Sequence, residues 1–127
     1  MPLGRSLILV YGYTDSAHFD YAHLSTDTGV KQPRHNGVFR VAGGERQRIS
    51  TEAGPPAFAE SKHWYHVVLR HDAKEGTVNV TVDGTSVPAL HATDPDLKAG
   101  RVGLGSFDET ASFKNVKITG DFAESKF

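Results

Sequence analysis

The chain contains no cysteine among its 127 residues. A disulfide framework, a thiolate metal site and a cysteine nucleophile are therefore excluded, and the redox compartment stays undetermined. An excess of one charge is lacking too, because 14 Lys and Arg stand against 15 Asp and Glu, for a formal net charge of −1. No whole-molecule field would attract nucleic acid or an anionic membrane, so the sequence predicts neither as a partner.

Long apolar runs and amphipathic helical stripes are absent as well. The apolar run Leu7 to Val10 is too short for the core of a signal peptide or for a membrane span. No stretch carries an extended apolar helical stripe, and 13 Gly and 6 Pro punctuate the chain. We therefore expect an almost entirely β protein with a single domain over 1–127, in which 121–127 form a loose tail.

The clearest positive signal is a hairpin between Trp64 and Gly84. The segment Thr77 to Val82 alternates valine with polar residues, which predicts a strand with one buried face. Asp83-Gly84 has the residues that tolerate positive φ in a two-residue hairpin loop. The chain is therefore expected to turn back into Thr85 to Leu90 as antiparallel sheet.

Similar short segments, separated by turn residues, are predicted along the whole chain. The expected strands are Leu7 to Tyr13, Phe19 to Ser25, Gly37 to Ala42, Arg46 to Thr51, Tyr65 to His71, Thr77 to Val82, Val87 to Leu90, Arg101 to Phe107 and Phe113 to Thr119. A single helical turn is expected over Thr93 to Leu97. Short strands at regular spacing are typical of a sandwich or barrel.

Several motifs follow one another in a familiar order. They are Trp64-Tyr65-His66-Val67, Val82-Asp83-Gly84, the glycine-rich segment Gly100 to Gly105, and Phe113 to Ile118. Over Tyr11 to Gly120 the chain thereby resembles the concanavalin A-like lectin/glucanase superfamily, and in particular bacterial LamG-like and keto-disaccharide-hydrolase-like domains. The resemblance implies a jelly-roll sandwich of antiparallel strands, an association with glycans, and an extracellular or periplasmic location.

Jelly rolls of this kind have further strands before the segment that Leu7 to Tyr13 resembles. The chain is therefore expected to begin inside the fold, as a fragment, as a minimal sandwich, or as a sandwich completed by a partner chain. An uncovered edge at Leu7 to Val10 would be adhesive, which predicts self-association.

Aromatic, imidazole and guanidinium side chains are concentrated in the first half of the chain. Strand alternation places Phe19, Tyr21 and His23 on one face. Tyr rings stack on the apolar faces of sugars, while His, Asn and Arg bind hydroxyls or carboxylates, so we expect a glycan site on a concave sheet face. Its candidate ligand-binding residues are Tyr11, Tyr13, Tyr21, His23, Arg34, His35, Asn36 and Arg48. The alternative is that Phe19 and Tyr21 belong to the core and that His23 is a half-buried histidine.

A binding module is favoured for this site, and two alternatives stay open. A retaining glucanase needs two carboxylates about 5 Å apart, and the nearest acidic pairs fall in predicted turns, which disfavours hydrolysis. A polysaccharide lyase would use a Tyr or His base to remove the proton α to a uronate carboxyl, with Arg, Asn or His neutralising that carboxylate. The residues that could supply these roles are Tyr21, His23, His35, Asn36 and Arg48. The second alternative is a LamG-like protein-interaction domain.

No cofactor is predicted. The histidine pairs 18 with 23 and 63 with 66 each differ by an odd number of positions, so their side chains point to opposite faces of a regular strand. A histidine-based zinc site is therefore not expected. Structural Ca²⁺ is an alternative that the resemblance implies, with Asp108, Glu109 and Asp121 as the carboxylates nearest the C-terminal strands.

Overall fold

The computed structural model describes residues 6–26, 36–50, 56–59, 63–72, 75–93, 100–105 and 113–118. Their strands are β1 (Ser6–Asp15), β2 (His18–Ser25), β3 (Gly37–Ala42), β4 (Glu45–Arg48), β5 (Val67–Asp72), β6 (Thr77–Val82), β7 (Thr85–Thr93) and β8 (Arg101–Gly105). None of the described residues belongs to a helix, so no helix in this part of the chain could cross a membrane. The prediction of an all-β protein is confirmed.

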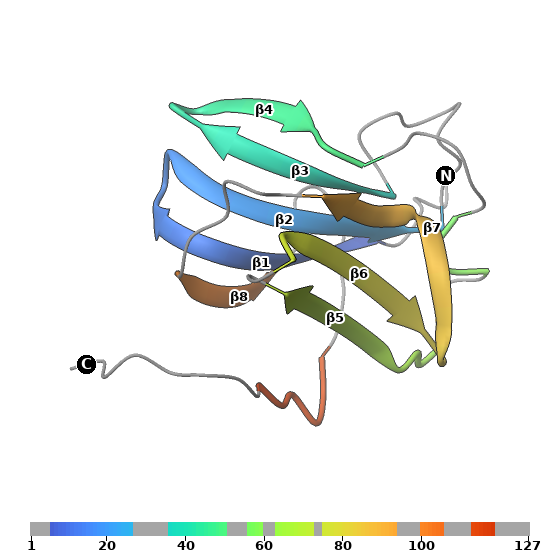
Figure 1. The fold of residues 1–127 in the computed structure, drawn as a ribbon. Coiled ribbons are helices and arrows are strands. Elements are labelled where there is room, and N and C mark those ends of the chain that lie inside the picture. Colours follow the sequence, from blue (N-terminus) through green and yellow to red (C-terminus); the bar gives the residue numbers. More distant parts are fainter. Residues whose placement is uncertain are drawn as a thin grey trace, which may run out of the picture.

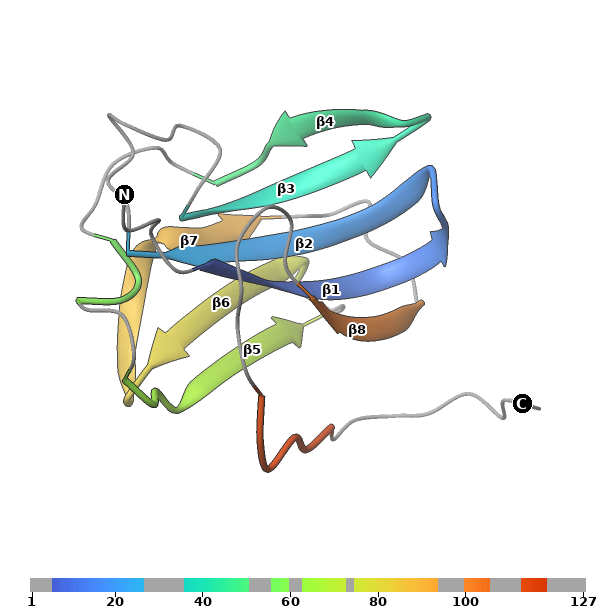
Figure 2. The same cartoon turned by 180° about the vertical axis from the view of Figure 1, so that it is seen from behind.

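The strands form two antiparallel sheets, which Figure 1 shows as two layers. The five-stranded sheet has the order β4-β3-β2-β1-β8, and the three-stranded sheet has the order β5-β6-β7. In Figure 1 and in the reverse view of Figure 2, β7 lies beside β3, and a bridge between Ser50 and Ala92 joins the two sheets. This is the arrangement of a β-sandwich.

The larger apolar core lies between the sheets. Among its buried residues are Tyr11, Ala22, Leu24 and Val38 of the five-stranded sheet and Val78, Val80, Val82, Val87, Leu90 and Ala92 of the three-stranded sheet. On β6 the buried valines alternate with less buried polar residues, as the sequence pattern predicts. Full burial of one such valine contributes about 1.5–3 kcal/mol to stability.

The predicted hairpin turn at Asp83-Gly84 is confirmed. Val82 pairs directly with Thr85, and Asp83 and Gly84 have φ values of 50° and 83°. Asp83 also accepts a hydrogen bond from the His66 amide through its carboxylate, and its own amide donates to the His66 carbonyl, both at 2.8 Å. The turn therefore ties the end of β6 to the residue just before β5.

Other predicted boundaries differ from the structure. β7 extends beyond both ends of the predicted Val87 to Leu90, and β5 begins at Val67. The predicted strand from Phe113 is wrong, because residues 113–118 are exposed and form no strand with any other described segment. Its alternating apolar residues favour a strand, but a strand also needs a neighbouring edge to pair with. Of the predicted helical turn Thr93 to Leu97, Thr93 is instead the last residue of β7, and 94–97 lie outside the described residues.

The prediction that Leu7 to Val10 forms an open edge is also wrong. β1 is paired on both sides, with Leu9 opposite Ala22 on β2 and opposite Leu104 on β8. Among the described strands, the outermost ones are β4 and β8 in one sheet and β5 and β7 in the other. Self-association stays a prediction, and it would involve one of these edges instead.

Candidate functional site

A second apolar cluster lies on the five-stranded sheet, on the side opposite the core. Its members are Ile8, Tyr21 and Phe39, with Val10, Phe19 and Val41 packed against them, and all come from β1, β2 and β3. These residues alternate along β2 and β3 with Ala22 and Val38, which point into the core. We call the side of the sheet that carries this second cluster the outer face.

Cross-strand pairing arranges the outer face in rows. The open row contains Arg101, Tyr13, Phe19, Val41 and Arg46, in the strand order β8, β1, β2, β3 and β4. The buried row beside it contains Gly103, Val10, Tyr21, Phe39 and Arg48 in the same strand order. The third row contains Gly105, Ile8, His23 and Gly37. Side chains on neighbouring strands within a row are close enough to interact.

The open row is an aromatic pair between two arginines. Tyr13 and Phe19 are both partly exposed, and their ring centroids are 5.7 Å apart. Arg101 pairs with Tyr13 at one end of the row, and Arg46 pairs with Val41 at the other. Both arginines are exposed. The row therefore presents an apolar centre with a cation at each end.

Gly12 determines that Tyr13 belongs to this row. Gly12 has a φ of 59°, and the register of β1 with both neighbouring strands shifts around it. A bulge of this kind changes the face to which the following side chain points. Tyr11 consequently lies in the core, where its ring is 5.7 Å from that of His71 on β5, while Tyr13 contacts Phe19. The structure therefore separates Tyr11 from Tyr13, Tyr21 and His23.

The buried row is built on a stacked aromatic pair. Tyr21 and Phe39 have ring centroids 5.2 Å apart and an interplanar angle of 19°, and they are 1% and 2% exposed. Arg46 donates a hydrogen bond of 2.8 Å to the Tyr21 hydroxyl. His23, 2% exposed, continues the series with its ring 6.4 Å from that of Tyr21. Tyr21 is thus a buried residue of the second cluster, in agreement with the alternative prediction that it belongs to the core. In this conformation of the protein, a ligand would not reach Tyr21.

Arg48 covers the end of the buried row. Its guanidinium carbon lies 4.9 Å from the centroid of the Phe39 ring, and its Nη1 donates to the Asn36 carbonyl and to the Ser50 hydroxyl, both at 3.3 Å. The guanidinium also occupies the space that a Cβ on Gly37 would need. Arg48 is therefore packed along the sheet, and Gly37 makes room for it.

Asn36 has a structural role at the start of β3. Its side-chain carbonyl accepts hydrogen bonds from the amides of Ser25 and Ala57, both at 2.9 Å, and the residue is 4% exposed. Asn36 also has a φ of 52°, a conformation that asparagine tolerates better than most residues. Of the other residues predicted in this loop, Arg34 and His35 lie outside the described part of the chain.

A second group of polar side chains lies on the core side of the same sheet. Asp20 pairs with Tyr11 on β1 and with Arg40 on β3, and Tyr11 contacts His71 of the other sheet. Asp20 is 6% exposed. Directly opposite residues of neighbouring antiparallel strands share a face, so Arg40 lies beside Asp20 on the core side. The burial of Asp20 and Tyr11 makes this group part of the interior rather than a ligand surface.

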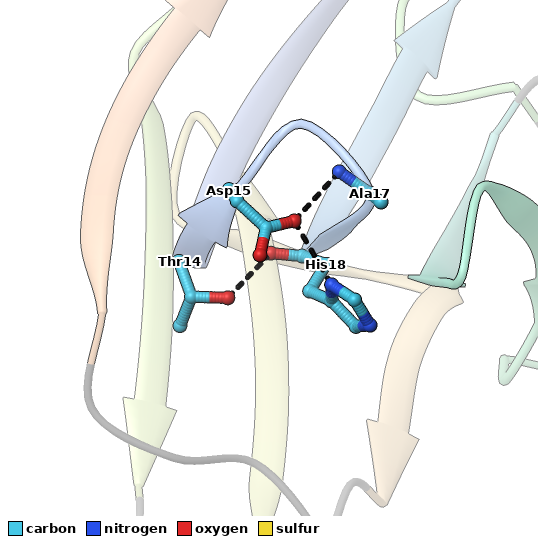
Figure 3. Close-up of polar contacts among 4 residues, drawn as sticks. All are labelled: Thr14, Asp15, Ala17 and His18. Carbon is cyan, nitrogen blue, oxygen red and sulfur yellow. Dashed lines mark hydrogen bonds and ion pairs between the residues drawn. The ribbon is translucent and has the colours of Figure 1, made fainter.

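The hairpin between β1 and β2 adjoins the open row, and Figure 3 shows its polar contacts. The Asp15 carboxylate accepts a hydrogen bond of 2.8 Å from the Ala17 amide and lies 2.9 Å from Nδ1 of His18. The Thr14 hydroxyl donates to the His18 carbonyl at 3.1 Å. The pKa of Asp15 is held below its ordinary value by two hydrogen bonds. The one with His18 lowers it most, followed by the one from the Ala17 amide.

No metal centre is found in the described ranges, because no three His, Cys, Asp or Glu side chains come together there in a way that could hold an ion. The carboxylates considered for Ca²⁺, at 108, 109 and 121, lie outside these ranges.

Most residues of the open row are not among the ligand-binding residues predicted from the sequence. They are Phe19, Val41, Arg46 and Arg101. Alternation alone would have found Arg46, which shares the phase of the selected Arg48 on β4. Arg101 carries no comparable local signal, because its position beside Tyr13 depends on the pairing of β8 with β1.

Comparison with models of protein families, with curated proteins and with solved structures gives no match to this chain. The resemblance to concanavalin A-like domains therefore remains a prediction.

Proposed function

We propose that this protein binds carbohydrate on the outer face of its five-stranded sheet, with the open row as the contact surface. The observation that carries the proposal is the partly exposed ring pair of Tyr13 and Phe19, set between the exposed side chains of Arg46 and Arg101. The predicted function, glycan binding, is unchanged. The proposed contact residues are those of the accessible open row, in place of the buried Tyr21 and His23 beside it.

The chemistry of the open row suits a sugar. A pyranose ring has an apolar face of C–H groups that packs on an aromatic ring, and hydroxyls around its edge that accept hydrogen bonds. Tyr13 and Phe19 supply the apolar surface, and the guanidinium groups of Arg46 and Arg101 supply donors at its ends. A flat apolar floor with a few placed polar groups is typical of small-ligand sites.

Burial favours binding over catalysis. A lyase base must come within hydrogen-bond distance of the proton that it removes. Tyr21 and His23, the predicted bases on this face, are 1% and 2% exposed. Tyr13 is partly exposed and shares its row with two arginines, so a lyase on this face would have to use Tyr13 in place of the predicted bases. We therefore place the binding module ahead of the lyase.

We further propose that the sandwich is a jelly roll of the concanavalin A-like kind, as the resemblance implies. Its support is the antiparallel five-stranded sheet, in which the last described strand, β8, returns to pair with the first strand, β1. Strands that are distant in sequence and adjacent in a sheet are typical of Greek-key sandwiches.

The test is retention of the protein in native gels that contain neutral or uronate-rich polysaccharides. We expect Tyr13→Ala and Phe19→Ala each to weaken retention about two- to twelvefold, because an aromatic contact contributes roughly 0.5–1.5 kcal/mol. Trp64→Ala is the matched control, since Trp64 is 54% exposed and lies before β5, away from the outer face.

Equal retention of the wild type and the Tyr13 and Phe19 variants would contradict the proposal, as would a loss confined to the Trp64 variant. A new absorbance from unsaturated uronate in the same samples would favour the lyase. Aromatic and arginine side chains are also typical of protein interfaces, so an absence of retention on every glycan would favour the protein-interaction alternative.

A further inference from the structure

The charges of the described residues are segregated on the five-stranded sheet. The charged side chains of the outer face are Arg46, Arg48 and Arg101, and none of its described residues is an Asp or a Glu. This contrasts with the formal net charge of −1 of the whole chain. The outer face is therefore locally cationic in a protein that is slightly acidic overall.

The described acidic residues lie elsewhere. Asp20 is buried on the core side of β2, and Glu45 alternates with Arg46 on β4 and so points to that same side. Asp72, Glu75 and Asp83 belong to the three-stranded sheet and its turns, and Asp15 contacts His18 in the hairpin. Of these six carboxylates, Asp15 lies nearest the open row, two residues after Tyr13, and there its carboxylate is 2.9 Å from Nδ1 of His18.

From this segregation we infer that the ligand is an anionic oligosaccharide that runs across the strands and bridges Arg46 and Arg101. The inference rests on the proposed function and adds the charge, the direction and the minimum length of the ligand. A guanidinium binds a carboxylate or a sulfate ester through two parallel hydrogen bonds, so acidic groups on the sugar would pair with the arginines while the sugar rings cover Tyr13 and Phe19.

The positions of the two arginines determine the direction and the length. Arg46 lies on β4 and Arg101 on β8, the two outermost strands of the sheet. Four strand spacings separate them, which corresponds to about 19 Å between their backbones. One sugar ring is much shorter than this distance. A single molecule therefore contacts both arginines only if it is an oligosaccharide that lies perpendicular to the strands.

One of the arginines is already oriented for this role. Arg46 donates its hydrogen bond to the Tyr21 hydroxyl, and Tyr21 is fixed by stacking on Phe39. An oriented guanidinium loses less conformational entropy when it binds than a freely rotating one.

The experiment is calorimetric titration of the full chain with oligogalacturonates of increasing length and with the same oligomers as methyl esters. The esters keep the sugar rings and lose the charge. We expect the free acids to bind at least about tenfold more tightly than the esters, with an advantage that falls as salt is added. Affinity should rise with length until the oligomer spans the row and then level off. Sulfated and unsulfated dextran oligomers, run in parallel, show whether sulfate replaces carboxylate.

Two variants test the bridge. Arg101→Gln should weaken binding of the long free acids about tenfold, abolish their advantage over short ones, and leave binding of the esters nearly unchanged. Arg70→Gln is the control, because Arg70 is an exposed arginine on β5, in the other sheet, and it should bind every oligomer like the wild type.

The outcomes separate this inference from the proposed function. If acids and esters bind equally and Tyr13→Ala weakens both, the protein binds carbohydrate and the anionic inference is overturned. If a monosaccharide acid binds as tightly as the longest oligomer, the bridge is overturned. If no carbohydrate binds, the proposed function fails as well. Single-stranded RNA combines phosphates with rings that stack, and tighter binding of RNA through the same arginines would also overturn the inference.

Discussion

Tyr11 and Tyr13 are two residues apart on β1, yet they lie on opposite faces of the sheet. Tyr11 is in the core with its ring 5.7 Å from His71, and Tyr13 is on the outer face with its ring 5.7 Å from Phe19. In a regular strand, residues at this spacing share a face. The bulge at Gly12 therefore creates the aromatic pair on which the proposed binding surface depends.

The bulge also needs glycine at a second position, which leads to a prediction about stability. Gly100 lies so close to Gly12 that a Cβ on Gly100 would be 2.7 Å from the Gly12 Cα and from the Tyr13 amide nitrogen. These are backbone atoms, so they have little freedom to move away. Gly100→Ala should lower the free energy of unfolding by about 1–3 kcal/mol, measured by urea denaturation.

Gly103→Ala is the matched control for the Gly100 variant. A Cβ on Gly103 would meet Val10 at an ordinary contact distance of 3.9 Å. Gly103→Ala should therefore leave the free energy of unfolding within about 0.5 kcal/mol of the wild-type value. Equal stability of the two variants would contradict the close approach of Gly12 and Gly100.

Tyr21 is expected to matter for stability more than for binding. Tyr21→Ala removes a large side chain that is 1% exposed and should cost about 3–5 kcal/mol. Tyr21→Phe keeps the ring and removes only the hydroxyl that accepts from Arg46, so it should cost about 1 kcal/mol and reduce glycan retention only slightly. Thermal unfolding and gel retention of both variants check this. A Tyr21→Phe protein of wild-type stability that no longer binds glycan would instead give Tyr21 a direct role in binding.

Asn36 is expected to stabilise the fold without contacting the ligand. Asn36→Ala leaves the buried amides of Ser25 and Ala57 without their acceptor and places alanine at positive φ, at a combined cost of about 3 kcal/mol. Asn79→Ala, which loses a bond to Ser86 at an exposed site, should cost less than about 1 kcal/mol. Chemical denaturation measures both. Similar costs for the two variants would contradict the structural role of Asn36.

The hairpin pair Asp15 and His18 gives a prediction about pH. The pKa of Asp15 should lie below the ordinary value of about 3.9, because its carboxylate is hydrogen-bonded chiefly to His18. The stabilisation is present above the unfolded pKa and is lost as the pH falls through the lower folded pKa. In His18→Ala the pKa should rise toward the ordinary value without reaching it, since the Ala17 amide still donates. NMR titration of the Asp15 carboxyl carbon measures the shift, and an unchanged pKa in the variant would refute the role of His18.

Strand alternation was sufficient to predict which residues of one strand share a face. The three valines of β6 are buried together, and Phe19, Tyr21 and His23 occupy one side of β2, as predicted. The Asp83-Gly84 turn was predictable because two-residue hairpin loops require positive φ. These features are local, so a short stretch of sequence contains the information that determines them.

The composition of the candidate site was harder to predict, because it depends on contacts between distant segments. Arg46 and Arg101 lie at the two ends of one row only because the strands of the sheet are in the order β4-β3-β2-β1-β8. The separation of Tyr11 from Tyr13 depends on a bulge that strict alternation does not contain. The burial of Tyr21 follows from stacking across the sheet, and the sequence pattern fits a buried or an exposed ring equally well.

Binding of an anionic oligosaccharide across the open row is best tested by NMR titration of the ¹⁵N-labelled protein with an oligogalacturonate long enough to span the row. We expect the largest amide shifts at Tyr13, Phe19, Val41, Arg46 and Arg101, and we expect Tyr13→Ala to need several-fold more oligomer to reach the same shifts. Shifts confined to β5, β6 and β7, or an unchanged titration of Tyr13→Ala, would contradict binding across this row.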